Sequence, residues 1–111
     1  MNMIISESQN GKVIKCKCCN KISIEFNNLN FSFTDAEFKI FSEYIKDIDG
    51  EYLEKANVNS IYNRKIVISV GHKNIRLLLK RHELLELREL LLPEFHNLPK
   101  YNKLFYRIYC N

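Results

Sequence analysis

Glycine and proline are scarce in this chain of 111 residues, which contains three glycines and two prolines. This scarcity argues against long disordered or low-complexity segments. No stretch reaches the roughly 18 consecutive apolar residues that a membrane-spanning helix requires. The opening segment, MNMIISESQNGK, also lacks the basic and apolar regions of a secretory signal. These absences together predict a soluble, cytoplasmic protein.

Recognisable catalytic motifs are also missing. The chain has no GxGxxG, no GxxxxGK[ST], no HExxH and no nucleophile elbow. His72, His82 and His96 are scattered, and no acidic residue is obviously paired with one of them. An enzyme is therefore the least supported class, although a small enzyme or a thiol redox protein stays open as an alternative.

The composition is that of an ordinary globular protein, with 46% hydrophobic and 27% charged residues. A chain of 111 residues is close to the typical size of one domain. We therefore predict a single domain over residues 1–111, whose core needs no disulfides.

One sequence pattern occurs twice, 46 residues apart. Residues 21–45 align without a gap with residues 67–91, and most matches other than the identical pairs keep only apolar character. The identical pairs are Ile22 and Ile68, Ser23 and Ser69, Asn28 and Asn74, Glu37 and Glu83, and Glu43 and Glu89. The chain is therefore predicted to contain two tandem units of one structure.

Each unit is predicted to form two strands and a helix. In the first unit, apolar residues alternate on either side of a two-residue turn at Asn27-Asn28, and Thr34 with Glu37 forms a capping box for the helix. The predicted inward positions are Ile22, Ile24, Phe26, Leu29, Phe31, Phe33, Phe38, Phe41, Ile45 and Ile48, with the helix ending at Asp49-Gly50. In the second unit they are Ile66, Ile68, Val70, Ile75, Leu77, Leu79, Leu84, Leu87 and Leu91, with Pro93 closing the helix.

These units predict an α+β fold in which two tandem ββα units form one antiparallel sheet of four to six strands covered by two helices. Residues 1–10 are predicted to be a mobile lead-in, and residues 12–16 a short strand. Residues 51–63 link the units. The C-terminal tail, 93–111, contains the segment KLFYRIY, whose composition favours a last strand.

The second helix carries more leucines than one sheet face needs. Leu85, Leu90 and Leu92 widen its apolar stripe, so they would cover the tail or a second copy of the chain. A homodimer is therefore one candidate assembly.

Three cysteines form a cluster at Cys16, Cys18 and Cys19, and Cys110 is the penultimate residue. Without a secretory signal, reduced thiols are expected. Cys16 and Cys19 have the spacing of a zinc knuckle, with Cys110 as a third ligand and Cys18, His72 or His96 as a fourth. Zinc, spare thiols and redox chemistry all stay open here.

Basic residues open the second helix, where Lys80, Arg81 and His82 replace the capping residues of the first. Cations oppose the helix dipole at this end, so an anion or a partner carboxylate would complete the site, with Arg76 nearby. The alternative is that water screens the mismatch. Acidic residues dominate between Asp35 and Glu54, whereas residues 64–81 carry six basic residues and no acid.

Nucleic-acid binding is a further alternative, through a basic strand face of Lys65, Arg76 and Lys80. The predicted aromatic residues face inward, however, so they cannot stack with bases, and the cations are few. Nucleic acid is therefore a less favoured partner than protein.

The segment CKCCNKISIEFNNLNFSFTDAEFKIFSEYI resembles a small bacterial family of uncharacterised proteins, in which a cysteine pair leads into a strand and a capped helix. The elements that carry the resemblance are Cys16 and Cys19, residues 24–28, and Glu37-Phe38, and the likeness extends over residues 16–91. The extra Cys18 leaves the identity of the liganding pair ambiguous. The resemblance implies a compact domain and no activity, so we expect a small intracellular binding or adaptor module of unknown protein partner.

Overall fold

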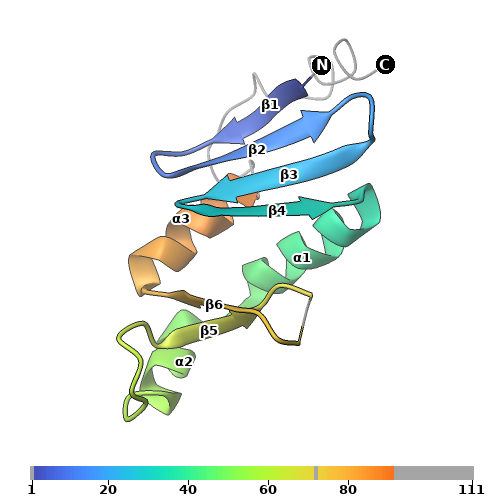
Figure 1. Ribbon diagram of the computed structural model, residues 1–111. Helices are drawn as coiled ribbons and strands as arrows, with labels where there is room; N and C mark the ends of the chain where they lie inside the picture. Colours follow the sequence, from blue (N-terminus) through green and yellow to red (C-terminus); the bar gives the residue numbers. More distant parts are fainter. Residues whose placement is uncertain (1, 72, 92–111) are drawn as a thin grey trace.

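A computed structural model of the protein describes residues 2–71 and 73–91, and it contains two antiparallel sheets with helices behind them (Figure 1). The fold is α+β, as predicted. The strands are β1 (Asn2–Glu7), β2 (Gly11–Cys16), β3 (Lys21–Phe26), β4 (Leu29–Phe33), β5 (Ile66–Ser69) and β6 (Arg76–Leu79). The helices are α1 (Asp35–Asp47), α2 (Gly50–Ala56) and α3 (Arg81–Leu91).

The larger sheet has the strand order β1-β2-β3-β4. Its inner face follows the predicted alternation, because Ile22, Ile24 and Phe26 are buried on β3. A turn at Asn27-Asn28 joins β3 to β4, with Phe26 opposite Leu29, and Asn27 adopts a positive φ of 54°. The predicted hairpin is thus confirmed.

The segment expected to be a lead-in forms the edge strand β1 from Asn2 to Glu7. It pairs antiparallel with β2, from Asn2 opposite Cys16 to Glu7 opposite Lys12, with a register shift between Ile4 and Ser6. Nothing in its local sequence alternates cleanly, so the strand depends on its pairing with β2.

Helix α1 begins at the predicted capping box. Its C-terminal end is capped by an arginine of α3, which sequence reasoning missed. The Thr34 hydroxyl accepts from the Glu37 N–H at 3.2 Å, and Glu37 accepts from the Thr34 N–H at 2.8 Å. At the other end, Arg88 of α3 donates to the Ile45 carbonyl at 3.3 Å and to the Ile48 carbonyl at 2.7 Å. Arg88 therefore satisfies carbonyls that a helix end leaves without partners.

The residues expected to close the first helix instead open another. Asp49 is the N-cap of α2, and its carboxylate accepts from the Tyr52 N–H at 3.0 Å. An Asp-Gly pair suits a helix end, but aspartate is equally a preferred N-cap, and here the second role prevails. The predicted link 51–63 therefore begins as a helix.

The strands β5 and β6 form a separate two-stranded sheet, rather than extending one sheet of four to six strands. Its predicted inner face is buried at Ile66, Ile68, Leu77 and Leu79. Ile75 lies before β6 and is 53% exposed, contrary to its predicted inward position. Alternation identifies the buried face of a strand but not which edges pair, and here β4 and β6 stay apart.

Helices α1 and α3 form a layer behind both sheets (Figure 1). Leu84, Leu87, Leu90 and Leu91 of α3 are all buried in one cluster with the inner faces of the strands. Within residues 2–71 and 73–91, no helix is long and apolar enough to cross a membrane. The two sheets therefore share a core through α1 and α3.

The leucines considered for self-association differ in burial. Leu85 is 48% exposed, whereas Leu90 is fully buried in the core. Leu92, Pro93 and the predicted last strand in 93–111 lie outside the described residues. Of the two leucines that the structure describes, only Leu85 is available at the surface, and the homodimer stays a prediction.

Glu86 of α3 holds the turn between β1 and β2. Its carboxylate accepts from the Ser8 hydroxyl at 2.7 Å, the Asn10 N–H at 2.8 Å and the Asn10 amide at 2.9 Å. Burial raises the pKa of Glu86, but the bonds from Ser8 and Asn10 outweigh it, so the pKa lies below its ordinary value. The folded protein therefore favours the charged form of Glu86.

We expect Glu86→Gln to lower the free energy of unfolding near neutral pH by about 1–3 kcal/mol, because charged hydrogen bonds are lost. A lowered folded pKa stabilises the protein above the unfolded pKa of about 4.3, and this contribution disappears as the pH falls through the folded pKa. The difference between wild type and variant should therefore shrink below about pH 4. Urea unfolding over a pH series measures it, with the exposed Glu43→Gln as control.

Candidate binding cleft between the two sheets

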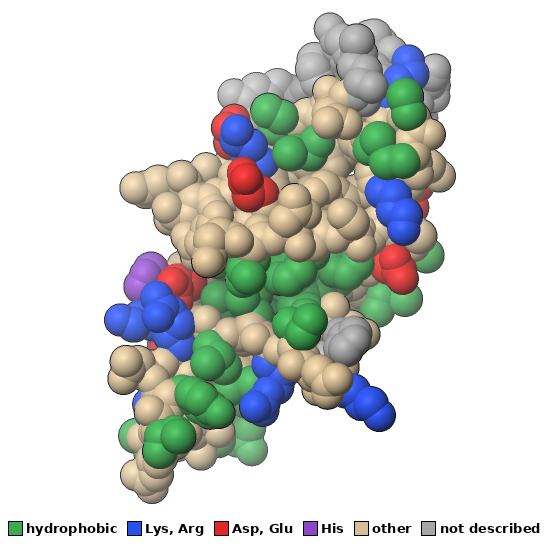
Figure 2. Space-filling view, viewed as in Figure 1, with side chains coloured by type: hydrophobic (Ala, Val, Ile, Leu, Met, Phe, Trp, Pro, Cys, Tyr) green, Lys and Arg blue, Asp and Glu red, His purple; other side chains and the backbone are tan. Residues whose placement is uncertain are grey.

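A cleft separates β4 from β6 on the face shown in Figure 2, where hydrophobic side chains gather in a band between the two sheets. Two hollows of 460 and 510 Å³ lie along it. Both volumes fall within the range of pockets that bind ligands. The cleft is therefore the main candidate site among the described residues.

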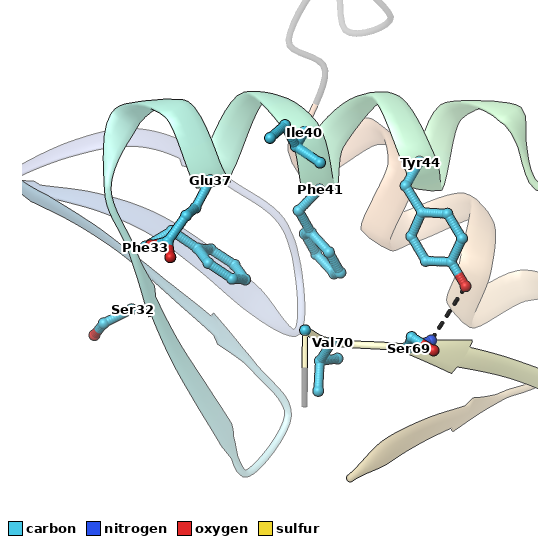
Figure 3. A pocket seen from close by; sticks show the side chains of 9 residues that line it. Ser32, Phe33, Glu37, Ile40, Phe41, Tyr44, Ser69 and Val70 are labelled. Atoms are coloured by element: carbon cyan, nitrogen blue, oxygen red, sulfur yellow. Dashed lines mark hydrogen bonds between the residues drawn. The ribbon is translucent and has the colours of Figure 1, made fainter. Parts of the chain in front are cut away.

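The aromatic hollow, of 460 Å³, lies between the end of β4, helix α1 and the end of β5 (Figure 3). The rings of Phe33 and Phe41 pack together with centroids 5.1 Å apart, and Val70 lies on the other side. The Ser69 N–H donates to the Tyr44 hydroxyl at 3.1 Å, which joins α1 to β5. This hollow offers an apolar surface.

The basic hollow, of 510 Å³, lies between the β3–β4 turn and the length of β6. Leu29 and Leu78 contribute apolar surface, and Arg64, Arg76 and Glu83 contribute charge. Arg64 and Glu83 bind each other through two hydrogen bonds of 2.8 and 3.1 Å. Arg76 is exposed and forms no ion pair with any residue of 2–71 or 73–91.

The apolar side chains of the cleft are more exposed than their sequence pattern predicts. Leu29 is 36% exposed, and Phe31 and Phe33 are only partly buried, although all three were predicted to face inward. The cause is the open edge of β4, which has β3 as its single hydrogen-bonded neighbour among the described strands. Covering such surface is worth about 25 cal/mol per Å², so the cleft favours an apolar occupant.

The residues predicted to bind an anion lie close to carboxylates of the protein itself. Arg81 forms an ion pair with Glu54 of α2, and the Lys80 N–H donates to Glu83 at 2.7 Å. His82 is exposed in the first turn of α3, and Arg76 lies on β6. An external anion at these residues stays a prediction, because Glu54 and Glu83 already supply negative charge there.

The electrostatics of this helix end follow from the same contacts. The side-chain bonds from Arg64 lower the pKa of Glu83, against the raising effect of burial, and the Lys80 N–H lowers it further. Glu83 therefore takes the capping role that the sequence leaves empty, since the residue before α3 is a lysine without a hydroxyl.

The residues of the basic strand face considered for nucleic acid differ in their surroundings. The Lys65 ammonium donates to the Ser60 carbonyl at 2.7 Å and its hydroxyl at 3.2 Å, and Lys65 is half-buried. Arg76 and Lys80 stay exposed. Binding to nucleic acid remains a prediction.

The structure joins Cys16 to Cys19 as a disulfide, where the sequence predicts reduced thiols. The tight turn brings the two residues together, with a Cα separation of 5.6 Å, because Asn20 adopts a positive φ of 54° and its N–H donates to the Cys16 carbonyl. The buried Lys15 supports the turn by donating to Asn20 at 3.0 Å and to Asp35 at 2.7 Å.

Of the other predicted metal ligands, the structure describes Cys18 alone, which lies in this same turn. Cys18 is exposed, and Cys110, His72 and His96 lie outside the described residues. In the part of the chain that the structure describes, no three His, Cys, Asp or Glu residues form a metal-binding group. Zinc therefore stays a prediction.

Sequence reasoning assigned every phenylalanine of the first unit to the core and so missed the cleft. The signal that could have indicated it is β4 itself, whose sequence LNFSF has no charge to mark a protected sheet edge. Ile40 and Tyr44, which fall outside the buried stripe of α1, are a second such signal.

A family model described as a family of unknown function, DUF6686, matches residues 1–111. This match confirms the resemblance inferred from the cysteine pair and the strand that follows it. No curated protein and no solved structure matches the chain.

Proposed function

The chain belongs to the family of unknown function DUF6686, and we propose that it is a small protein-binding adaptor that holds a segment of its partner in the cleft. The observation that carries this proposal is the band of partly exposed apolar side chains between β4 and β6 (Figure 2). Soluble proteins keep such patches where a partner covers them.

The shape of the cleft supports a protein segment as the occupant. The basic hollow lies at the start of β4 and along β6, and the aromatic hollow lies at the ends of β4 and β5, so together they form an elongated trough. Backbone groups, aromatic rings and cations all lie along it. A peptide chain offers complementary groups at regular spacing, which suits such a trough.

Peptide selection tests the proposal. A displayed library of random peptides would be selected against the full chain, and enriched peptides would be titrated against Ile40→Glu and wild type. Ile40 lines the aromatic hollow and is 69% exposed, so the charge should leave the fold intact. We expect binding to weaken at least about 10-fold, because a carboxylate then replaces an apolar contact.

The matched control is Ile61→Glu, since Ile61 is 93% exposed and does not line either hollow. It should bind the peptides as wild type does. A library that yields no binder, or binders that tolerate Ile40→Glu, would show that the cleft is not a peptide site.

The duplication of the ββα unit belongs to this proposal too. Strand, strand and helix follow one another in both aligned regions, as β3-β4-α1 and as β5-β6-α3, which supports a common origin. Under this interpretation each copy contributes one edge strand to the cleft. The first copy brings the apolar wall and the second brings the cations.

Stabilisation by zinc is a separate part of the proposal. The Cys19 N–H donates to the Cys16 sulfur at 3.3 Å, an arrangement that would stabilise a thiolate in the reduced protein. Zinc requires thiolates, so it would replace the disulfide. Protein purified under reducing conditions without chelator should then carry close to one equivalent, and less than about a tenth would exclude zinc binding.

A further inference from the structure

We infer that the partner segment binds as an additional β-strand between β4 and β6, with apolar residues at alternate positions and an acidic residue facing Arg76. This inference rests on the proposed function and specifies its recognition mode. Strand addition of this kind joins an extended peptide to an exposed sheet edge through main-chain hydrogen bonds.

The backbone of β4 presents donors and acceptors to the cleft. In a hairpin with a two-residue turn, Phe26 and Leu29 form the closing hydrogen-bonded pair, so the pairs Ile24–Phe31 and Ile22–Phe33 are hydrogen-bonded as well. The intervening residues, Asn30 and Ser32, then turn their N–H and C=O groups away from β3. These groups are available to a strand in the cleft.

The two edges of the larger sheet are built differently. The outer strand β1 has a register shift between Ile4 and Ser6 and carries Glu7, and both features discourage strand pairing. The opposite strand β4 has continuous register along LNFSF and carries no charge and no proline. Among the described residues, one edge of the sheet is thus protected and the edge beside the cleft is left open.

The floor of the cleft favours apolar residues on one side of the added strand. Phe31 and Phe33 continue the buried inner face of β3, and Leu77 of β6 continues the buried inner face of β5. A strand beside them directs alternate side chains to this same inner face. Its inward residues would therefore cover the aromatic hollow and extend the core.

The solvent side of β6 specifies the charge of the partner. Leu77 and Leu79 face inward, so Arg76 faces outward, where a residue of the added strand would stand beside it. The surrounding segment, residues 64–81, contains six basic residues and no acid. Arg64 and Arg81 already bind Glu83 and Glu54, whereas Arg76 is exposed and lines the basic hollow, so it is placed to select an acidic residue.

A proline in β4 tests the edge directly. Ser32→Pro removes an N–H that faces the cleft but takes no part in the ladder with β3, and edge strands tolerate proline at such positions. We expect peptides selected against the full chain to bind Ser32→Pro at least about 10-fold more weakly, with Ser32→Ala binding normally. Thermal unfolding would verify that both variants fold.

An N-methyl scan of the peptide tests the same contacts without changing the protein. Each selected peptide would be synthesised with one backbone N–H methylated at a time. A strand between β4 and β6 should lose about 10-fold or more in affinity at successive positions of its centre, whereas its ends should tolerate methylation. Tolerance throughout the centre would overturn strand addition, even if Ser32→Pro had failed to fold.

A charge exchange tests the acidic position. Arg76→Glu should weaken binding of an acidic peptide about 10-fold, and a peptide with lysine in place of that acid should recover most of the loss. Lys39→Glu on α1 is the control, because Lys39 is exposed and lines neither hollow. Equal effects of Arg76→Glu on both peptides would overturn the assigned contact.

The outcomes separate this inference from the proposed function. In one outcome, peptide binding is weakened by Ile40→Glu but unchanged by N-methylation and by Ser32→Pro. That result would support the adaptor function and overturn the added strand. A dimer of the full chain that Ser32→Pro dissociates would assign the cleft to a second copy and overturn the inference. A synthetic peptide of residues 92–111 that outcompetes the selected peptides would overturn it in favour of the chain's own segment.

Discussion

Leu87→Ala should lower the free energy of unfolding by about 2–5 kcal/mol, one of the two largest effects that we expect from a single substitution. Leu87 is fully buried in α3, in the layer that covers both sheets. Truncation would remove apolar contacts and leave a cavity that the helix and strands around it can fill only in part. Urea unfolding followed by circular dichroism measures the loss.

The control for this prediction lies on the same helix. Leu85 is 48% exposed, so Leu85→Ala should change the free energy of unfolding by no more than about 0.5 kcal/mol. Both substitutions change helix propensity equally, so the difference between their free energies of unfolding reports the effect of burial. Similar losses for the two variants would mean that α3 does not bury the face described here.

Gly11→Ala should cost roughly 1–3 kcal/mol or more, because the site has no room for a methyl group. A Cβ at Gly11 would lie 2.6 Å from the Glu25 carbonyl oxygen and 2.8 Å from Cδ2 of Leu90. The first contact is with backbone of the central strand β3, which cannot move without disturbing the ladder. The added methyl would therefore push α3 away from the sheet.

A double-mutant cycle and a second glycine test this explanation. Combining Gly11→Ala with Leu90→Ala should cost less than the sum of the single variants, since the smaller side chain relieves one of the clashes. Gly50→Ala should be milder, because its Cβ would meet only the terminal methyls of Leu84 and Ile66, at 3.0 and 3.2 Å. Strict additivity at Gly11 and Leu90 would contradict the described contact.

Local patterns in the sequence predicted most of the local structure. The alternation at Ile22, Ile24 and Phe26 identified a strand and its buried face, and Thr34 with Glu37 identified the start of α1. These features depend on neighbours within a few residues, which a single sequence contains. Leu84, Leu87 and Leu91 of α3 were assigned to the core for the same reason, and all three are buried.

The features that sequence reasoning missed depend on distant partners. Arg88 caps a helix whose end lies 40 residues earlier in the chain, and Glu86 binds a turn 76 residues away at Asn10. The division into two sheets is of the same kind, because it depends on how α1 and α3 hold β4 and β6. The cleft could not be predicted for this reason, since it exists only between elements whose spacing no local pattern specifies.

The bond from Arg88 to the end of α1 has a mechanical consequence. If α1 and α3 slid past each other, the Ile45 and Ile48 carbonyls would lose their hydrogen-bond donor. The two helices should therefore move together as one rigid body. Both sheets pack on this helix pair, and no hydrogen-bonded ladder joins the two sheets that the structure describes. The motion of lowest energy is therefore expected to be a rotation of the smaller sheet relative to the two helices. This rotation would let the width of the cleft adjust to different bound segments.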